Sequence, residues 1–303
     1  MINFKPITID DKLIYEKYLK DGKERGCEFS FANLYLWGRQ NAALIHDHLV
    51  IFSQFNRRTV YPFPVGTGDK KAVIDDIISD AKERGIPCRI TGIRPEQREI
   101  IENLYPNKFR FHGDSGSFDY VYDICDLAEL KGRKYQSKRN HCNRFYLTYP
   151  DYSTQPLTDD NIHLAKELAD KWYADKLAEN PDADFHMERK ALEKALRDYK
   201  KLGMDGMVLL ICNEAVAFTM GNIMSDTTFD VNFEKARSDV QGAYAVINRE
   251  FAGYIHNKYP DILYLDREED MGLEGLRKAK ESYYPHHMID KCWACLLEEE
   301  YEY

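Results

Sequence analysis

The sequence predicts a mixed α/β protein built from two similar halves. The chain has 303 residues, which is enough for two ordinary domains. Hydrophobic residues make up 44% of the sequence and charged residues 31%, as in a globular protein and not a disordered one. Segments with helical spacing alternate with short apolar runs, and each half follows the order helix, hairpin, strand, helix, strand, helix, strand.

In the first half, the apolar residues of 9–20 gather on one side of a helix. Gly85 closes a second helix and Pro95 opens a third, at positions where these residues are favoured. The predicted helices are 9–20, 69–85 and 94–106, and the predicted strands are 42–52 (a hairpin that turns around Asp47-His48), 57–65, 87–93 and 109–124.

The second half follows a predicted loop between Pro150 and Pro156. Thr158 is predicted to cap its first helix, and Gly203 to end its second. Asn213-Glu214 separates two apolar runs and predicts a hairpin. The predicted helices are 158–178, 186–202, 242–259 and 272–282, and the predicted strands are 207–212, 215–224, 227–236, 261–266 and 286–297.

Composition excludes several classes of protein. A net charge of −9 argues against a dedicated nucleic-acid-binding protein, and against a DNA-binding one in particular, because such proteins usually carry a basic surplus; a local basic patch stays open. The N-terminal residues have no apolar core of signal-peptide length, and no apolar run approaches the roughly 18 residues of a membrane span. We therefore expect a cytoplasmic protein without integral membrane contact, whose seven cysteines are reduced.

The segment 131–144 carries six positive charges and no acid, which locally reverses the charge of the chain. Wound as a helix, it places Arg139 on the same apolar stripe as Tyr135, Cys142 and Tyr146. An arginine there needs an anion or a hydrogen-bond partner. The segment therefore predicts an anion site made of Lys134, Lys138 and Arg139. The alternative is a solvated helix face whose arginine pairs with a structural aspartate.

Three segments resemble a known family: 123–145 (DICDLAELKGRKYQSKRNHCNRF), Asp266 to Pro285, and Phe29 to Trp37. They are similar to the interdomain segment, the late acidic loop and helix, and the aromatic N-terminal stretch of the phosphatidylglycerol lysyltransferase C-terminal-domain family, which is related to Fem-type aminoacyltransferases. The chain resembles its soluble stand-alone members, whose activity is largely unassigned.

This resemblance implies two tandem acetyltransferase-like (GNAT) domains, each with a mixed, mostly antiparallel sheet flanked by helices. The order of the predicted elements favours the same arrangement. We place the domains at 1–130 and 151–303, with 131–150 as a basic connecting helix. The resemblance also implies acyl or aminoacyl transfer to an amine or hydroxyl, with aminoacyl-tRNA or a CoA thioester as donor substrate and no tightly bound cofactor.

Two acidic strands are candidates for the reacting centre. In the strand 227–235, Asp230 and Asn232 alternate with apolar residues, which predicts either a cleft lined by these two side chains or a face exposed to solvent. Asp266 ends the next predicted strand, and Glu268, Glu269 and Asp270 follow it. Glu268 and Glu269 are at least as well suited to stabilising the N-terminus of the next helix. A carboxylate at the end of a strand suits a general base for an amine, so we predict Asp266 or Asp230 as the catalytic residue.

Other residues have weaker signals. Lys278 and Lys280 are candidates for contacting a phosphate or the tRNA 3′ end, or they lie on a basic helix surface. Tyr283 is a candidate cleft residue and proton donor, or it packs in the core. Asp239 occupies the position of the Arg or Gln of an acetyltransferase pyrophosphate loop, which argues against ordinary acetyl-CoA use. The single Cys292-Trp-Ala-Cys295 pair lacks further ligands, so no metal site is predicted.

The favoured hypothesis is an acyltransferase whose carrier phosphates are held by Lys138, Arg139 and Lys278. Two alternatives remain open. One is a non-catalytic protein that keeps the fold and binds a ligand or a partner. The other is an RNA-binding protein that uses the basic segment and shows steep salt dependence.

Overall fold

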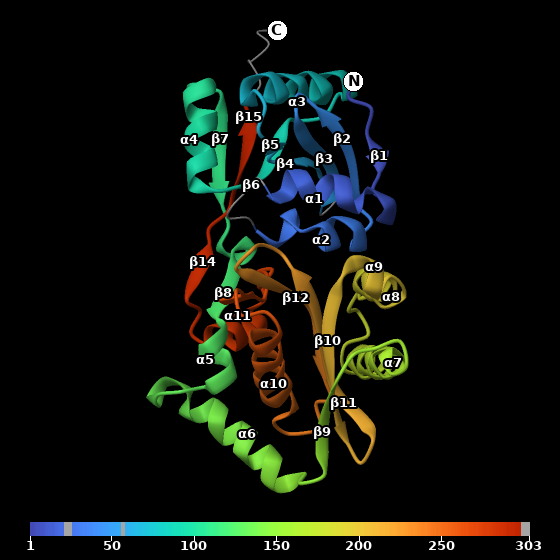
Figure 1. Ribbon diagram of the computed structural model, residues 1–303. Coiled ribbons are helices and arrows are strands. Elements are labelled where there is room, and N and C mark those ends of the chain that lie inside the picture. Colours follow the sequence, from blue (N-terminus) through green and yellow to red (C-terminus); the bar gives the residue numbers. More distant parts are fainter. Residues whose placement is uncertain (21–25, 56–57, 298–303) are drawn as a thin grey trace. The chain divides into compact units, whose positions relative to one another are not determined.

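The computed structural model describes residues 1–20, 26–55 and 58–297 (Figure 1). The chain divides into two compact units, and neither is one continuous stretch of sequence. Unit 1 consists of Met1–Asp119, Glu269–Glu274 and Met288–Tyr303, and unit 2 of Tyr120–Glu268 and Gly275–His287. The predicted limits at residues 130 and 150 differ from these, because 120–130 lie in unit 2 and two late segments lie in unit 1.

Unit 1 contains a mixed sheet with the strand order β1-β2-β3-β4-β6-β15-β7, and β5 pairs with β3. Most of its ladders are antiparallel, whereas β4 and β6 are parallel. Its elements are β1 (Lys5–Pro6), α1 (Lys12–Lys20), α2 (Phe31–Leu36), β2 (Gln40–Ile45), β3 (His48–Phe55), β4 (Arg58–Pro62), β5 (Val65–Gly66), α3 (Lys70–Arg84), β6 (Arg89–Ile93), α4 (Pro95–Leu104), β7 (Phe109–Gly113) and β15 (Cys292–Leu296).

Local sequence explains the element ends in unit 1. The Asp69 side chain accepts hydrogen bonds from the backbone N–H groups of Lys71 and Ala72 at the start of α3, and Gly85 ends that helix with a φ of 67°. His46 and Asp47 both have positive φ and form the tight turn between β2 and β3. The predicted hairpin is therefore present, with its turn one residue earlier than predicted.

Unit 2 contains the sheet β14-β8-β13-β12-β11-β10-β9. Figure 1 shows α10 and α7 on opposite faces of its central strands, and β11 contacts both helices. Its elements are β8 (Asp119–Asp123), α5 (Ile124–Glu129), α6 (Gln136–Thr148), β9 (Tyr152–Pro156), α7 (Ile162–Glu179), α8 (His186–Arg197), α9 (Tyr199–Leu202), β10 (Met204–Ile211), β11 (Glu214–Ile223), β12 (Thr228–Ala236), α10 (Ala243–Lys258), β13 (Tyr264–Asp266), α11 (Glu274–Glu281) and β14 (His287–Ile289). The first residues of β8 and α11 and the last two of β14 belong to unit 1.

Three predictions about local structure are wrong. The predicted loop after Pro150 is β9, an edge strand whose polar residues hide the strand signal. The helix predicted from Thr158 begins at Ile162, because the backbone N–H of Thr158 donates to the Asn161 side chain and forms a turn instead. The single strand predicted for 286–297 is two strands, β14 and β15, which belong to different sheets.

The pairing of β12 changes along its length. It is parallel to β13 for only three residue pairs, of which Asp230 and Asp266 are the last, and it then continues alone on that side to Ala236. On its other side, the register with β11 shifts around Gly221. A Cβ atom at Gly221 would lie 1.9 Å from the carbonyl oxygen of Asp230, so only glycine fits this bulge.

Within the described residues, the structure contains no helix that combines the length and the apolar character needed to cross a membrane.

Candidate functional site

The polar face of β12 is buried at Asp230 and partly buried at Asn232 and Glu234. Asp230 is 0% exposed, which excludes the solvent-facing alternative for this residue. The Asn232 amide donates to Asp230 Oδ2 at 3.0 Å and to Glu268 Oε1 at 3.4 Å. Glu234, two residues further along, accepts from the Arg267 guanidinium at 2.9 Å. Asp230, Asn232 and Glu234 thus form a polar row along one strand.

The end of β13 supplies the side chains that face this row. Asp266 is 0% exposed, and its Oδ1 accepts from the backbone N–H of Glu268 at 2.7 Å. Glu268 has a φ of 58°, which a residue with a side chain adopts at a cost of about 1–3 kcal/mol. The buried ammonium of Lys280 donates to the carbonyl oxygens of Arg267 (2.6 Å) and Glu268 (3.0 Å). Asp266 and Lys280 therefore hold the strained turn that presents the half-buried Glu268 side chain.

Two cations lie against the ring of Tyr283. Lys138 Nζ is 3.9 Å from the ring centroid and the Arg267 guanidinium is 5.2 Å from it. Burial and the nearby Arg267 charge lower the pKa of Lys138, and burial raises the pKa of Tyr283. Among the described residues, Lys138 has no carboxylate partner. An anion here would offset the repulsion between the two cations.

The Arg267–Glu234 ion pair leaves one hydrogen-bond donor and one acceptor without a partner in the described part of the chain. Arg267 Nη1 and Glu234 Oε2 are buried and have no hydrogen-bond partner among the described residues. Burying such atoms costs free energy unless a ligand or water satisfies them. Together with Lys138, they form a buried polar cluster around Tyr283 that is suited to an incoming charged group.

The basic segment separates into different roles. α6 buries Cys142 and Phe145, and Lys138 faces Tyr283. Arg139 donates to the carbonyl oxygens of Leu130 and of Gly132, so it stabilises the loop that follows α5. Lys134 makes an exposed ion pair with Asp126 at 3.0 Å. Of the three predicted anion ligands, only Lys138 lies beside Tyr283 in this way.

Lys278 is exposed on α11, whereas its neighbour Lys280 is buried. Arg267 and Glu234 are not among the predicted site residues, and Asp266 is preferred to Glu268 as the predicted base. The sequence does contain a pointer to both Arg267 and Glu234. Glu234 lies on the polar face of the alternating strand 227–235, and Arg267 directly follows Asp266. The positive φ of Glu268 has no signature in the sequence.

Unit 1 contains a cluster of possible metal ligands, in which atoms of Cys27, Asp119 and Glu269 lie within 4.8 Å of one another. The ammonium of Lys291 binds this cluster, at 2.9 Å from Asp119 Oδ1 and 2.8 Å from Glu269 Oε1, and it also contacts Glu28 Oε2 at 2.9 Å. A cationic side chain therefore already compensates these carboxylates.

Comparisons with known proteins identify the family. A model described as phosphatidylglycerol lysyltransferase, C-terminal, matches residues 20–295. The chain belongs to this family. The structure of a conserved protein of unknown function from Bacteroides thetaiotaomicron VPI-5482 is 40% identical, with coverage of 98% of this chain and 100% of that one and a TM-score of 0.92. The structure of L-PGS from Bacillus licheniformis is 17% identical, with coverage of 96% and 93% and a TM-score of 0.65.

More distant structures share the fold. FemX is 10% identical, with 98% of each chain covered and a TM-score of 0.60. A tandem GNAT protein from the clavulanic acid biosynthesis pathway is 7% identical, with coverage of 99% and 100% and a TM-score of 0.52. These likenesses and the two mixed sheets confirm the predicted family and the predicted tandem GNAT-like fold.

A curated relative, uncharacterized protein MYCGA3080 of Mycoplasmoides gallisepticum (strain R), is 24% identical over 210 residues, which are 67% of this chain. The chain spans 62% of the length of that relative.

The segment between β12 and α10 is where an acetyltransferase would carry its pyrophosphate loop. Asp239 is paired there with Arg237 at 2.7 Å, and Arg237 also binds Glu214. Arg237 is the one cationic residue of the loop 237–242, and its guanidinium is already paired with carboxylates. Gly242, with a φ of 90°, precedes α10, and a Cβ atom there would lie 2.8 Å from the carbonyl oxygen of His141.

Proposed function

We propose that this protein is an acyltransferase whose reacting centre lies in unit 2, between the polar row of β12 and the turn after β13. The observation that carries the proposal is the position of Lys138 and Arg267 on the ring of Tyr283, beside the carboxylates of the same row. The cations would bind a phosphate of the carrier, either aminoacyl-tRNA or acyl-CoA, and the carboxylate side would receive the acceptor.

Glu268 is the general base in this proposal. Asp230 and Asp266 remain predicted catalytic residues, but both are completely buried, and Glu268 is only partly buried. We propose that Asp266 acts as a positioning residue through the Glu268 backbone, and Asp230 through Asn232. The backbone of Glu268 is fixed in a strained conformation, which keeps its carboxylate in one orientation. A general base benefits from such a fixed orientation toward its substrate.

The reaction balances with these groups alone. The acceptor nitrogen or oxygen attacks the carbonyl carbon of the carrier's ester or thioester, and Glu268 takes the acceptor's proton. The bond between the carbonyl carbon and the carrier oxygen or sulfur then breaks, and Glu268 returns the proton to that leaving atom. Backbone N–H groups of β12 beyond Asp230, which have no β13 partner, are candidates for stabilising the oxyanion.

Asp239 stands where an acetyltransferase carries Arg or Gln, and this acidic residue favours aminoacyl-tRNA over acetyl-CoA as the donor. A cytoplasmic location fits either donor. A ligand-binding protein without turnover is the second candidate function, favoured by the same acidic substitution. Incubation of the purified protein with each donor and a panel of amines separates these two functions, because transfer yields a covalent product and binding does not.

Lys138→Gln is expected to weaken donor binding by about 10- to 100-fold, since a hydrogen bond to a charged group contributes about 1.5–3 kcal/mol. Lys134→Gln is the matched control. It removes the same charge from an exposed ion pair on the same basic segment, so its effect should stay within a few-fold. Titration of labelled donor measures both affinities. Equal weakening by the two variants would show that only the overall charge of the segment matters.

A further inference from the structure

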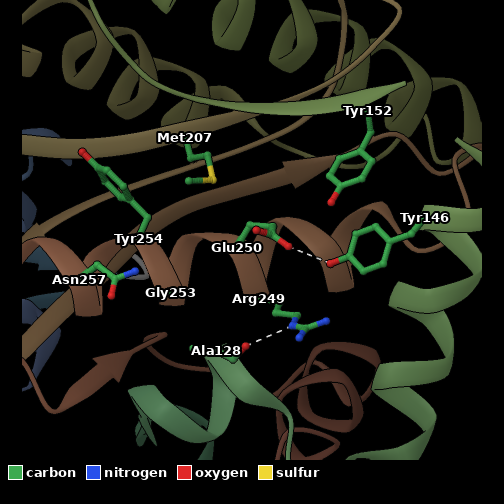
Figure 2. A pocket seen from close by; sticks show the side chains of 9 residues that line it. All are labelled: Ala128, Tyr146, Tyr152, Met207, Arg249, Glu250, Gly253, Tyr254 and Asn257. Atoms are coloured by element: carbon green, nitrogen blue, oxygen red, sulfur yellow. Dashed lines mark hydrogen bonds between the residues drawn. The ribbon is translucent and has the colours of Figure 1, made fainter. Parts of the chain in front are cut away.

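A cavity in unit 2 is lined by none of the residues of the polar row of β12. It has a volume of about 540 Å³, within the range of small-molecule sites, and is lined by residues of α5, α6, β9, β10 and α10 (Figure 2). Two neighbouring residues of α10, Arg249 and Glu250, contribute opposite charges to its wall.

These two charges do not neutralise each other. Figure 2 shows the Glu250 carboxylate directed toward Tyr146, whereas the Arg249 guanidinium lies toward Ala128. Glu250 Oε1 accepts from the Tyr146 hydroxyl at 2.8 Å, and Arg249 Nε donates to the Ala128 carbonyl at 3.1 Å. Among the described residues, neither side chain forms an ion pair, although both are partly buried.

The surroundings of Glu250 suit an ammonium group. The rings of Tyr146 and Tyr152 stack at a centroid distance of 5.0 Å next to the carboxylate. Aromatic faces and edges beside a carboxylate are a recognised environment for organic cations. On the other side, the guanidinium of Arg249 keeps N–H donors beyond its bond to Ala128, and such a group binds carboxylate or phosphate oxygens well.

We propose that this cavity binds a small dipolar molecule that carries a primary ammonium group and an acidic group a few bonds apart. The ammonium pairs with Glu250 beside the stacked tyrosines, and the acidic group pairs with Arg249. Free α-amino acids and phosphorylated amines both have this chemistry. The proposal is independent of the acyl transfer proposed above, because it uses none of the residues of the polar row.

The test is a calorimetric titration of the full chain with four probes: glycine and L-lysine as amino acids, O-phosphoethanolamine as a phosphorylated amine, and ethylamine, which has no acidic group. We expect saturable binding of at least one dipolar probe, with ethylamine at least about 10-fold weaker. If the amino acids bind more tightly, the ligand is a free α-amino acid. If O-phosphoethanolamine binds more tightly, the ligand is a phosphorylated amine.

Two variants that each remove one charge locate the site. Glu250→Gln keeps an acceptor for Tyr146 but removes the charge, and it should weaken the dipolar probe about 10-fold or more. Arg249→Gln should weaken the same probe to a similar extent and leave ethylamine unchanged. Asp261→Asn, an exposed residue beyond α10, is the control and should change nothing. Thermal unfolding checks that each variant folds. No saturable binding of any dipolar probe, or equal binding of ethylamine, would overturn the proposal.

Discussion

Glu268→Gln is expected to lower the rate of acyl transfer by about 10²–10⁴-fold, the usual contribution of a positioned general base. The glutamine keeps the size of the side chain and can still accept from Asn232, so the turn after β13 should persist. The measurement is single-turnover transfer from a saturating donor. Glu281→Gln, on the exposed face of α11, removes an equal charge and should retain full activity.

Asp266→Asn distinguishes a base from a positioning residue. The asparagine retains an oxygen that accepts the Glu268 backbone N–H, the contact that Asp266 makes at 2.7 Å. If Asp266 only positions Glu268, the rate of acyl transfer in the variant should fall by at most about 10-fold, as expected for one weakened hydrogen bond. A loss as large as that of Glu268→Gln would instead identify Asp266 as the group that takes the proton.

The sequence predicted the two halves of the site to different extents. The alternation in 227–235 correctly separated Asp230 and Asn232 from the apolar face of the strand, because period-2 patterning is local. It did not reveal that Asp230 is completely buried, or that Asn232 and Glu234 are partly buried, since burial depends on β13 and on residues such as Arg267, which pairs with Glu234. Alternation shows which residues share a face, and other elements decide what that face contacts.

The basic helix shows the same limit. Lys138 and Arg139 are neighbours, and helical winding favoured Arg139 as the inward residue. The structure directs Arg139 to carbonyl oxygens at Leu130 and Gly132, both of which have positive φ. That backbone arrangement is invisible in a charge pattern. Likewise, periodicity suggested one strand for 286–297, whereas β14 and β15 flank Lys291 and join different sheets.

Lys291→Met is expected to lower the free energy of unfolding by about 3–5 kcal/mol, the cost of removing one partner from a buried ion pair. The ammonium of Lys291 is the shared cation of Glu28, Asp119 and Glu269, and Asp119 is completely buried. Without it, three carboxylates would face one another in a region poor in water. Lys82→Met, at an exposed position of α3, is the control and should change stability by less than about 0.5 kcal/mol. Denaturant unfolding measures both.

The same cluster predicts how stability depends on pH. Burial and the charges of Asp119 and Glu28 outweigh the opposing effect of Lys291 and raise the pKa of Glu269 from 4.5 to about 7. Between these two values the folded protein holds a proton that the unfolded chain has released. Glu269 should therefore make stability fall as pH rises from 4.5 to 7, with a slope of up to about 1.4 kcal/mol per pH unit. Comparing the unfolding of the unmodified chain with that of Glu269→Gln isolates this effect, because the variant lacks the titrating group. An identical pH slope in the two proteins would mean that Glu269 is ionised throughout this range and that Lys291 fully compensates its charge.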